Sequence, residues 1–134
     1  MLKNKLYAKY WPEERREQRW LTASPEGLVV DVFTGGYEQQ LQWYDCCGSL
    51  FLETMYGQVR VGRKGWLELV PSTKDQWEED PQNIAFHFSS STGLLQESAT
   101  GKAVRVWMKN TKVKAVENYN PKWWVAQWDM VLTE

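Results

Sequence analysis

Two cysteines and one histidine are the residues with the strongest nucleophilic and acid–base chemistry in this sequence. Cys46 and Cys47 are adjacent, and His87 is the single histidine. A thiol beside an imidazole could form a nucleophile–base pair. Nothing in the sequence brings His87 to either cysteine, and no carboxylate is identifiable that would orient the imidazole. We therefore expect the cysteines to pack as small apolar residues at a strand end, and His87 to lie on a polar strand face.

Four carboxylates in alternating apolar and polar segments are a second source of chemistry, namely Asp31, Glu53, Glu68 and Asp129. A pair of them could supply the acid and base of glycoside hydrolysis. The solvent face of an antiparallel sheet also requires polar residues at such positions. That requirement explains all four without a catalytic role.

Motifs of the common enzyme classes and of metal sites do not occur. The chain has no Gly-x-Ser-x-Gly, no phosphate-binding glycine-rich loop, no His-Glu-x-x-His and no Cys-x-x-Cys. A tetrahedral zinc site would have to recruit scattered carboxylates. The sequence therefore predicts a non-enzymatic protein with no catalytic residues, no metal and no cofactor.

Tryptophan is the unusual residue of this chain, with nine copies in 134 residues. Indole rings gather in cores, at interfaces and on stacking surfaces. Trp43, Trp66 and Trp128 share strand faces with apolar residues, so we expect them in the core. The remaining tryptophans lie in loops or beside polar residues and are expected outside the core: Trp11, Trp20, Trp77, Trp107 and one of the neighbours Trp123 and Trp124.

Charge is balanced over the whole chain but uneven along it. The net charge is −1 and the pI is about 5.9, which gives no overall case for nucleic acid or an anionic membrane. Residues 101–122 nevertheless carry six basic residues and one acidic residue. Basic and aromatic residues in this segment and around it are our predicted contact residues: Arg63, Lys64, Arg105, Trp107, Lys109, Lys112, Trp123 and Trp124.

The fold is predicted to be mainly β, an antiparallel barrel-like sheet with one or two short helices; a β-sandwich is the alternative. Short apolar segments alternate with turn signals throughout. Hairpins are expected at Gly35-Gly36, at Gly57 and at Asn110, and the glycine pair allows the positive φ angles of a tight turn. Closing such a sheet removes edges that would otherwise aggregate.

Three further segments complete the predicted single domain over residues 1–134. Residues 12–20 are a charged segment that forms either a helix or a loop, and residues 72–77 form a short helix with the spacing of a capping box. Residues 123–132 are expected to form one long closing strand. No internal repeat is evident.

The compartment is predicted to be the cytoplasm or another reducing intracellular space. No apolar run is long enough for a membrane helix, and the amino-terminal residues lack a secretory signal. Adjacent cysteines cannot form an ordinary structural disulfide with each other.

These observations favour binding over catalysis. The first hypothesis is a protein-interaction module, an accessory or assembly subunit of a larger complex that uses exposed Trp and basic residues. The alternative is a β-barrel that binds single-stranded nucleic acid through the basic hairpin and Trp107. A second alternative is a barrel that binds a small ligand or a carbohydrate on a Trp platform.

Overall fold

The computed structural model describes residues 3–8, 19–46, 49–71, 84–107, 109–122 and 124–133. In these residues, twelve strands form one antiparallel sheet, and the only helical elements are single 3-10 turns. The mainly β, barrel-like prediction is confirmed. In chain order the elements are β1 (Lys3–Ala8), β2 (Arg19–Ser24), β3 (Gly27–Asp31), η2 (Tyr37–Gln39), β4 (Leu41–Cys46), β5 (Ser49–Thr54), β6 (Gly57–Val61), η3 (Arg63–Gly65), β7 (Leu67–Val70), β8 (Ala85–Phe88), β9 (Leu95–Glu97), β10 (Ala103–Trp107), β11 (Lys112–Val116), η5 (Trp124–Ala126) and β12 (Trp128–Thr133).

Six strands form a barrel-like ring. The pairing runs from β12 through β1, β4, β5 and β8 to β9. The backbone N–H of Trp128, at the start of β12, donates to the carbonyl oxygen of Gly93, two residues before β9, at 2.7 Å. This bond joins the last strand of the ring to the first, so the ring strands are covered by neighbours on both sides.

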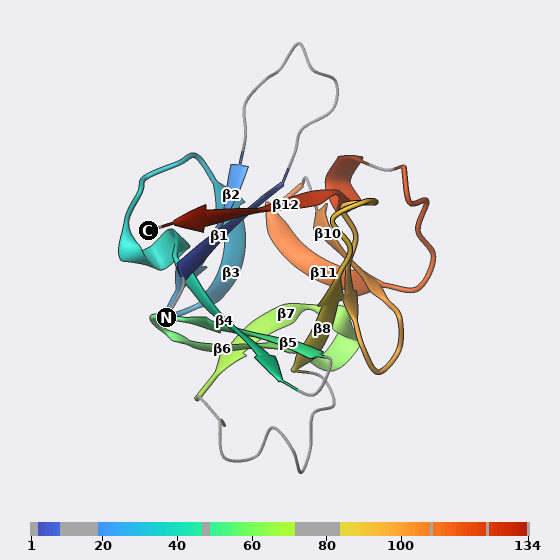
Figure 1. Cartoon of the computed structure of the whole chain (residues 1–134), viewed down its shortest axis with the longest axis horizontal. Coiled ribbons are helices and arrows are strands. Elements are labelled where there is room, and N and C mark those ends of the chain that lie inside the picture. The colour runs from blue at the N-terminus through green and yellow to red at the C-terminus, as the bar shows by residue number, and fades with distance from the viewer. Residues whose placement is uncertain are drawn as a thin grey trace.

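The other six strands form three hairpins, β2–β3, β6–β7 and β10–β11. Each hairpin is attached to a ring strand, to β1, β5 and β9 in turn. The hairpins also meet one another, because β3 pairs with β11 and Trp66 forms an isolated bridge with Lys114. In Figure 1 the three thirds of the chain occupy three sectors around a common centre.

The pairing pattern therefore repeats every four strands. In each of the first two units, the first strand pairs with the second and the fourth, and the second pairs with the third. The third unit keeps the first-to-second and second-to-third pairings, and the Gly93–Trp128 bond links its first and fourth strands. The sequence prediction of no internal repeat is corrected here: the repeat exists in the topology, although the residues that build it differ from unit to unit.

Alternation along the strands explains why these residues form a sheet around one core. In β11, Val113 and Ala115 are buried while Lys112 is exposed, and in β3, Leu28 and Val30 are buried. Period-two burial is what a strand with one core face and one outer face requires. The main core cluster draws residues from all three units, including Leu21, Leu41, Phe86, Val104 and Trp128.

The hairpin expected at Gly35-Gly36 is wrong. β3 pairs with β2 and β11, whereas β4 pairs with β1 and β5. Residues 32–36 instead lead into the 3-10 turn η2, so the two segments enter different parts of the sheet. The hairpins expected at Gly57 and at Asn110 are confirmed, as β5–β6 and β10–β11.

The long strand expected over residues 123–132 is also wrong in its first part. Residues 124–126 form the 3-10 turn η5, and the strand begins only at Trp128. The predicted segment at 12–20 ends in strand β2, since Arg19 and Trp20 belong to it. Its residues 12–18, and the predicted helix at 72–77, lie outside the described residues. None of the helical turns in the described ranges could span a bilayer.

Candidate functional site

An aromatic–basic cluster lies on the outer face of the β10–β11 hairpin. Val104 and Val106 of β10 are buried, so Arg105 and Trp107 point to the opposite face. In the strand register, Arg105 is opposite Lys114 and Trp107 is opposite Lys112. Two cations that face each other across a strand pair repel, which is a local cost of this arrangement.

Two indole rings moderate that repulsion. The Lys114 ammonium lies 5.2 Å from the ring centroid of Trp66 and 5.6 Å from that of Trp107, and the Arg105 guanidinium carbon lies 4.6 Å from the Trp107 centroid. The two rings meet edge to face, with centroids 6.0 Å apart. Each such cation–π contact contributes about 0.5–1 kcal/mol at an exposed site. We call Trp66, Arg105, Trp107 and Lys114 the indole–cation cluster.

A cleft of about 380 Å³ opens beside this cluster. Its lining includes Arg105, Trp107 and Lys114, with Lys64 from η3 and Lys102 preceding β10. Glu117 is its single acidic lining residue, and the Lys102 ammonium lies 3.9 Å from the Glu117 carboxylate. Partial burial lowers the pKa of Arg105 below its ordinary value. The cleft is thus rich in positive charge.

The η3 turn holds Trp66 and Lys64 against β11 through a close backbone approach. Gly65 has a φ of +88°, and a Cβ at this position would stand 2.5 Å from the carbonyl oxygen of Ala115. Lys64 adopts a φ of 66°, a left-handed conformation that is uncommon for a residue with a side chain. The turn is therefore shaped by contact with the neighbouring hairpin.

The predicted contact residues are only partly brought together. Lys64, Arg105 and Trp107 line the same cleft, and Trp107 is 36% exposed, as expected for a tryptophan outside the core. Lys112 lines a different cleft together with Trp66, while Arg63 and Lys109 are exposed and do not line the cleft beside the indole–cation cluster. Trp123 and the side chain of Trp124 lie outside the described part of the chain.

Sequence reasoning missed Trp66, Lys102 and Lys114 as site residues. Trp66 was expected in the core, but it is half-buried, outside the core cluster and packed against Trp107. Trp128 is fully buried as expected, and Trp43 packs against the core from a half-buried position. Trp20, expected outside the core, is half-buried with its ring 4.8 Å from that of Phe33. Trp11 and Trp77 lie outside the described residues.

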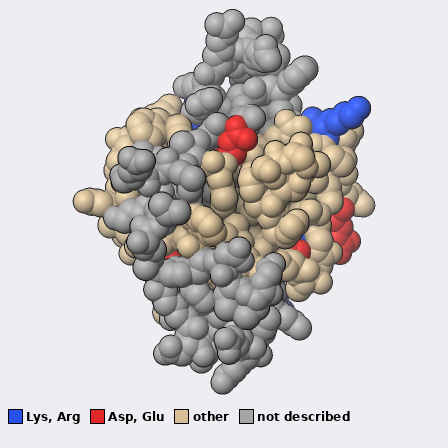
Figure 2. All heavy atoms as spheres, in the orientation of Figure 1, with Lys and Arg blue, Asp and Glu red and all other residues tan. Residues whose placement is uncertain are grey.

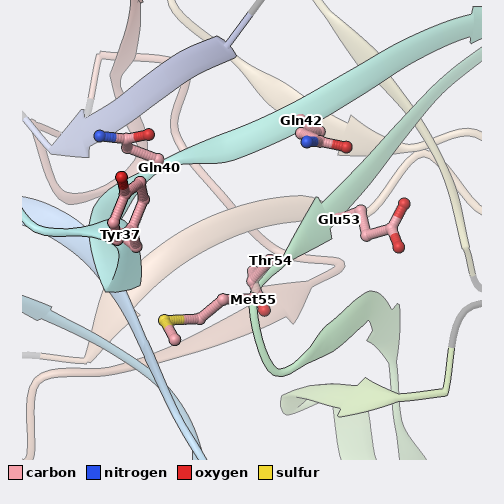
Figure 3. Close-up of a pocket in the computed structure, with 6 residues that line it drawn as sticks. All are labelled: Tyr37, Gln40, Gln42, Glu53, Thr54 and Met55. Atoms are coloured by element: carbon pink, nitrogen blue, oxygen red, sulfur yellow. The ribbon is translucent and has the colours of Figure 1, made fainter.

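A second cleft lies between η2 and the β4–β5 pair and has a volume of about 280 Å³. Its lining residues, drawn in Figure 3, are Tyr37, Gln40, Gln42, Glu53, Thr54 and Met55. Gln42 and Glu53 are register partners on neighbouring strands, so their side chains lie on one face. Figure 3 shows the Tyr37 ring beside Gln40 at one end, with Gln42 and Glu53 at the other. Tyr37 is 67% exposed.

A buried glutamine fixes the turn that presents Tyr37. Gln39 is fully buried, and its amide nitrogen donates to the carbonyl oxygen of Val32 at 2.8 Å and to the Thr22 hydroxyl at 3.0 Å. Its amide oxygen accepts from the backbone N–H groups of Thr34 at 2.8 Å and Gly35 at 3.3 Å. This side chain replaces the backbone pairing that a hairpin would have supplied.

The residues considered for catalysis are not assembled into a constellation that the structure describes. His87 is exposed on β8, as expected, but Cys47 and the side chain of Cys46 lie outside the described set. Asp31 forms an ion pair with Arg19 at 3.6 Å, and Glu68 forms one with Arg60. No group of three or more metal-binding side chains occurs in the described ranges.

The ring of six strands, the three hairpins that meet one another and the four-strand period together define a β-trefoil. The solved structures agree with this fold. One is the GlcNAcα1-4Gal-releasing endo-β-galactosidase from Clostridium perfringens, with a TM-score of 0.76 and 11% identity. The match covers 98% of this chain but only 33% of that enzyme, so the chain spans about a third of the enzyme's length.

A second similar structure is ThreeFoil, a designed protein with three-fold symmetry. Its TM-score is 0.71 and its identity 18%, with 96% of this chain and 97% of that chain covered. No protein-family model matches the sequence, and none of the curated proteins matches it either. The comparisons therefore define the fold.

Proposed function

We propose that this chain is a non-enzymatic module that binds a carbohydrate in the Tyr37 cleft. The observation that carries the proposal is one cleft that holds a largely exposed Tyr37 ring at one end and amide and carboxylate groups along its length. An aromatic face packs against the apolar C–H face of a sugar ring. An amide group can donate to one sugar hydroxyl and accept from its neighbour, whereas a carboxylate accepts from both. The cleft supplies both kinds of group.

The fold comparison supports the same ligand class. A segment with this fold makes up about a third of an enzyme whose name describes cleavage of a galactose-containing glycan. Among the described residues that line the Tyr37 cleft, Glu53 is the single carboxylate. Glycoside hydrolysis ordinarily uses two carboxylates, so the cleft is better suited to holding a sugar than to cleaving one.

This proposal places carbohydrate binding ahead of the protein-interaction hypothesis that the sequence alone favoured. An accessory or assembly role with a protein partner, and the reducing intracellular compartment, stay predictions. The compartment rests on Cys46 and Cys47, whose side chains lie outside the described residues. Some of the residues that suggested single-stranded nucleic acid, Arg105 and Trp107 among them, line the cleft beside the indole–cation cluster.

The test is a binding measurement with a panel of immobilised neutral glycans terminating in galactose or N-acetylglucosamine, followed by titration calorimetry with the best binder. Tyr37→Ala should weaken binding about tenfold or more, because it removes the stacking surface. Gln42→Ala should weaken it less, since it removes one hydrogen-bonding group.

The matched control is Tyr56→Ala. Tyr56 is also an exposed tyrosine but does not line the Tyr37 cleft, so its loss should leave glycan affinity unchanged. A panel with no binder, or equal losses for Tyr37→Ala and Tyr56→Ala, would overturn the proposal.

A further inference from the structure

The cleft beside the indole–cation cluster brings several cations close together, and part of this arrangement is unfavourable for the fold. Arg105 and Lys114 are direct register partners on one face, where like charges destabilise a strand pair. Lys64 reaches the same cleft from a left-handed backbone conformation, which carries its own conformational cost. Unfavourable features of this kind tend to gather at binding sites, where a ligand offsets them.

Among the described residues, Lys102 is the only lysine of this cleft that pairs with an acidic side chain. The Lys102 ammonium lies 3.9 Å from the Glu117 carboxylate, and Glu117 is the single acidic residue in the lining. Lys64 and Lys114 form no salt bridge with an acidic side chain of the described residues. The Lys114 ammonium instead rests between two indoles, and a lysine has three donor hydrogens to offer.

The size of the cleft limits what can enter it. Its volume of about 380 Å³ falls near the lower end of small-molecule sites. An extended nucleic acid would need a longer basic track with repeated stacking surfaces. On the face shown in Figure 2, the charged side chains of the described residues are scattered and mixed in sign. One anionic group seated among a few cations fits this cleft better than a phosphate backbone.

We propose that this cleft is a second binding site, which takes a sugar carrying a carboxylate or a sulfate group. Lys114, Arg105 and Lys64 would hold the anionic group, and the exposed edge of Trp107 would contact the sugar ring. The choice of a sugar rests on the proposed carbohydrate function. The choice of an anion rests on this cleft alone.

The experiment compares three probes on the whole chain: a neutral disaccharide, its uronic acid counterpart and its sulfated counterpart, each at low and at physiological ionic strength. Both acidic probes should bind more tightly than the neutral one, and added salt should weaken them. Stronger binding of the uronic acid identifies the carboxylate as the natural group, and stronger binding of the sulfated sugar identifies the sulfate. Equal affinity for all three probes would overturn the proposal.

Variants locate the site. Lys114→Gln should weaken the acidic probes about tenfold, because it removes a charge from the centre of the cleft. Lys109→Gln is the control, an exposed lysine of the same hairpin that does not line the cleft, and it should change affinity less than about twofold. Lys64→Gly removes a cation and also removes the backbone strain of a left-handed residue with a side chain. Weaker binding by this variant therefore cannot be attributed to unfolding.

Two further outcomes separate this proposal from its alternatives. If Tyr37→Ala abolishes neutral-glycan binding but spares the acidic probes, the two sites are independent. If no neutral glycan binds while Lys114→Gln still weakens the acidic probes, the carbohydrate proposal for the Tyr37 cleft fails and this one stands. A labelled single-stranded oligonucleotide that binds more tightly than either acidic sugar, and loses affinity in Lys114→Gln, would assign the cleft to nucleic acid instead.

Discussion

Among single residues, Glu38 has a pKa that the fold changes through one hydrogen bond. The Thr34 hydroxyl donates to the Glu38 carboxylate at 2.5 Å, and this bond, with a smaller backbone contribution, lowers the pKa of Glu38 below its ordinary 4.5. A carboxyl whose pKa is lower in the folded state stabilises the fold above 4.5, and this contribution is lost as pH falls through the lowered pKa. Thr34→Val should therefore move the pKa of Glu38 back towards 4.5, as measured by an NMR pH titration.

Thr92→Val serves as the control for that titration. The Thr92 hydroxyl accepts from a backbone N–H in a different loop, so its loss should leave the titration of Glu38 unchanged. The stability difference between Thr34→Val and the native chain should also shrink as the pH falls below the lowered pKa. A titration midpoint that does not move in Thr34→Val would contradict the assigned cause.

The next prediction concerns Gln39, whose polar side chain is fully buried and forms four hydrogen bonds. Gln39→Ala would leave the Val32 carbonyl and the Thr34 N–H without these partners, and we expect a loss of about 3 kcal/mol in the free energy of unfolding. Its neighbour Gln40 is half-buried, and Gln40→Ala should cost less than about 1 kcal/mol. Urea unfolding of both variants measures the difference, and equal losses would show that the buried network does not hold the turn.

Residue patterns could predict part of the candidate sites and not the rest. The exposure of Trp107 follows from alternation along its own strand, and its pairing with basic residues follows from the hairpin at Asn110. Trp66 belongs to another hairpin, and only the bridge between Trp66 and Lys114 brings it to the cluster. Contacts between hairpins depend on the tertiary arrangement, which period-two patterns do not encode. The same limit hid the shared cleft of Gln40, which follows η2, and Glu53, which lies on β5.

Among the elements, the segment at Gly35-Gly36 shows that a turn can be predicted correctly while the pairing of the two strands that flank it is predicted wrongly. The glycine pair does end one segment, and Gly35 does adopt a positive φ of 72°. The chain then enters η2, because the Gln39 side chain satisfies the backbone of residues 32–35. A hairpin requires its two strands to pair with each other. The local sequence does not show that the Gln39 side chain will hydrogen-bond to the backbone of Thr34, five residues earlier.

The packing of η3 on β11 gives a prediction for elements. Gly65→Ala adds a Cβ where the Ala115 carbonyl oxygen stands 2.5 Å away, at a φ of +88°. Gly101→Ala is the matched control: its φ is +76°, but nothing lies within 4 Å of the added Cβ. The control should cost about 1 kcal/mol for the left-handed conformation alone, and Gly65→Ala about 3 kcal/mol, because the turn must also move away from β11.

Unfolding midpoints and Trp fluorescence test that difference. Displacement of the turn should separate Trp66 from Trp107, so the Gly65→Ala variant should show altered emission before unfolding, and Gly101→Ala should not. Similar costs for the two variants would mean that the backbone approach at Gly65 is not a tight constraint.

For the whole molecule, the barrel could be predicted from the sequence and its three-fold repeat could not. Many short strands without long edges favour closure, and the ring of six strands achieves it. The repeat is hidden because corresponding positions hold different residues. η2 ends at Gln39, and Leu41 follows two residues later. η5 ends at Ala126, and Trp128 follows at the same spacing. All four are buried, so the positions share an environment but not a residue type.

Trp128 occupies one of these buried positions and also contributes to the stability of the whole fold. Its indole N–H donates to the Val104 carbonyl oxygen at 2.9 Å, its ring is fully buried in the core cluster, and its backbone N–H closes the ring of strands at Gly93. Trp128→Leu keeps an apolar residue, as in the first unit, but loses volume and the indole bond. We expect a cost of about 3 kcal/mol in the free energy of unfolding.

Because core residues from all three units pack on one another, that loss should weaken the molecule as one unit. Far-UV circular dichroism and the fluorescence of the remaining tryptophans should give coincident urea transitions in Trp128→Leu, shifted together from those of the native chain. Trp107→Leu, at an exposed tryptophan, removes two cation–π contacts and should shift them by a smaller amount, about 1–2 kcal/mol. Transitions that separate in Trp128→Leu would instead mean that the carboxy-terminal four-strand unit unfolds alone, and that the Gly93–Trp128 bond does not couple it to the rest of the ring.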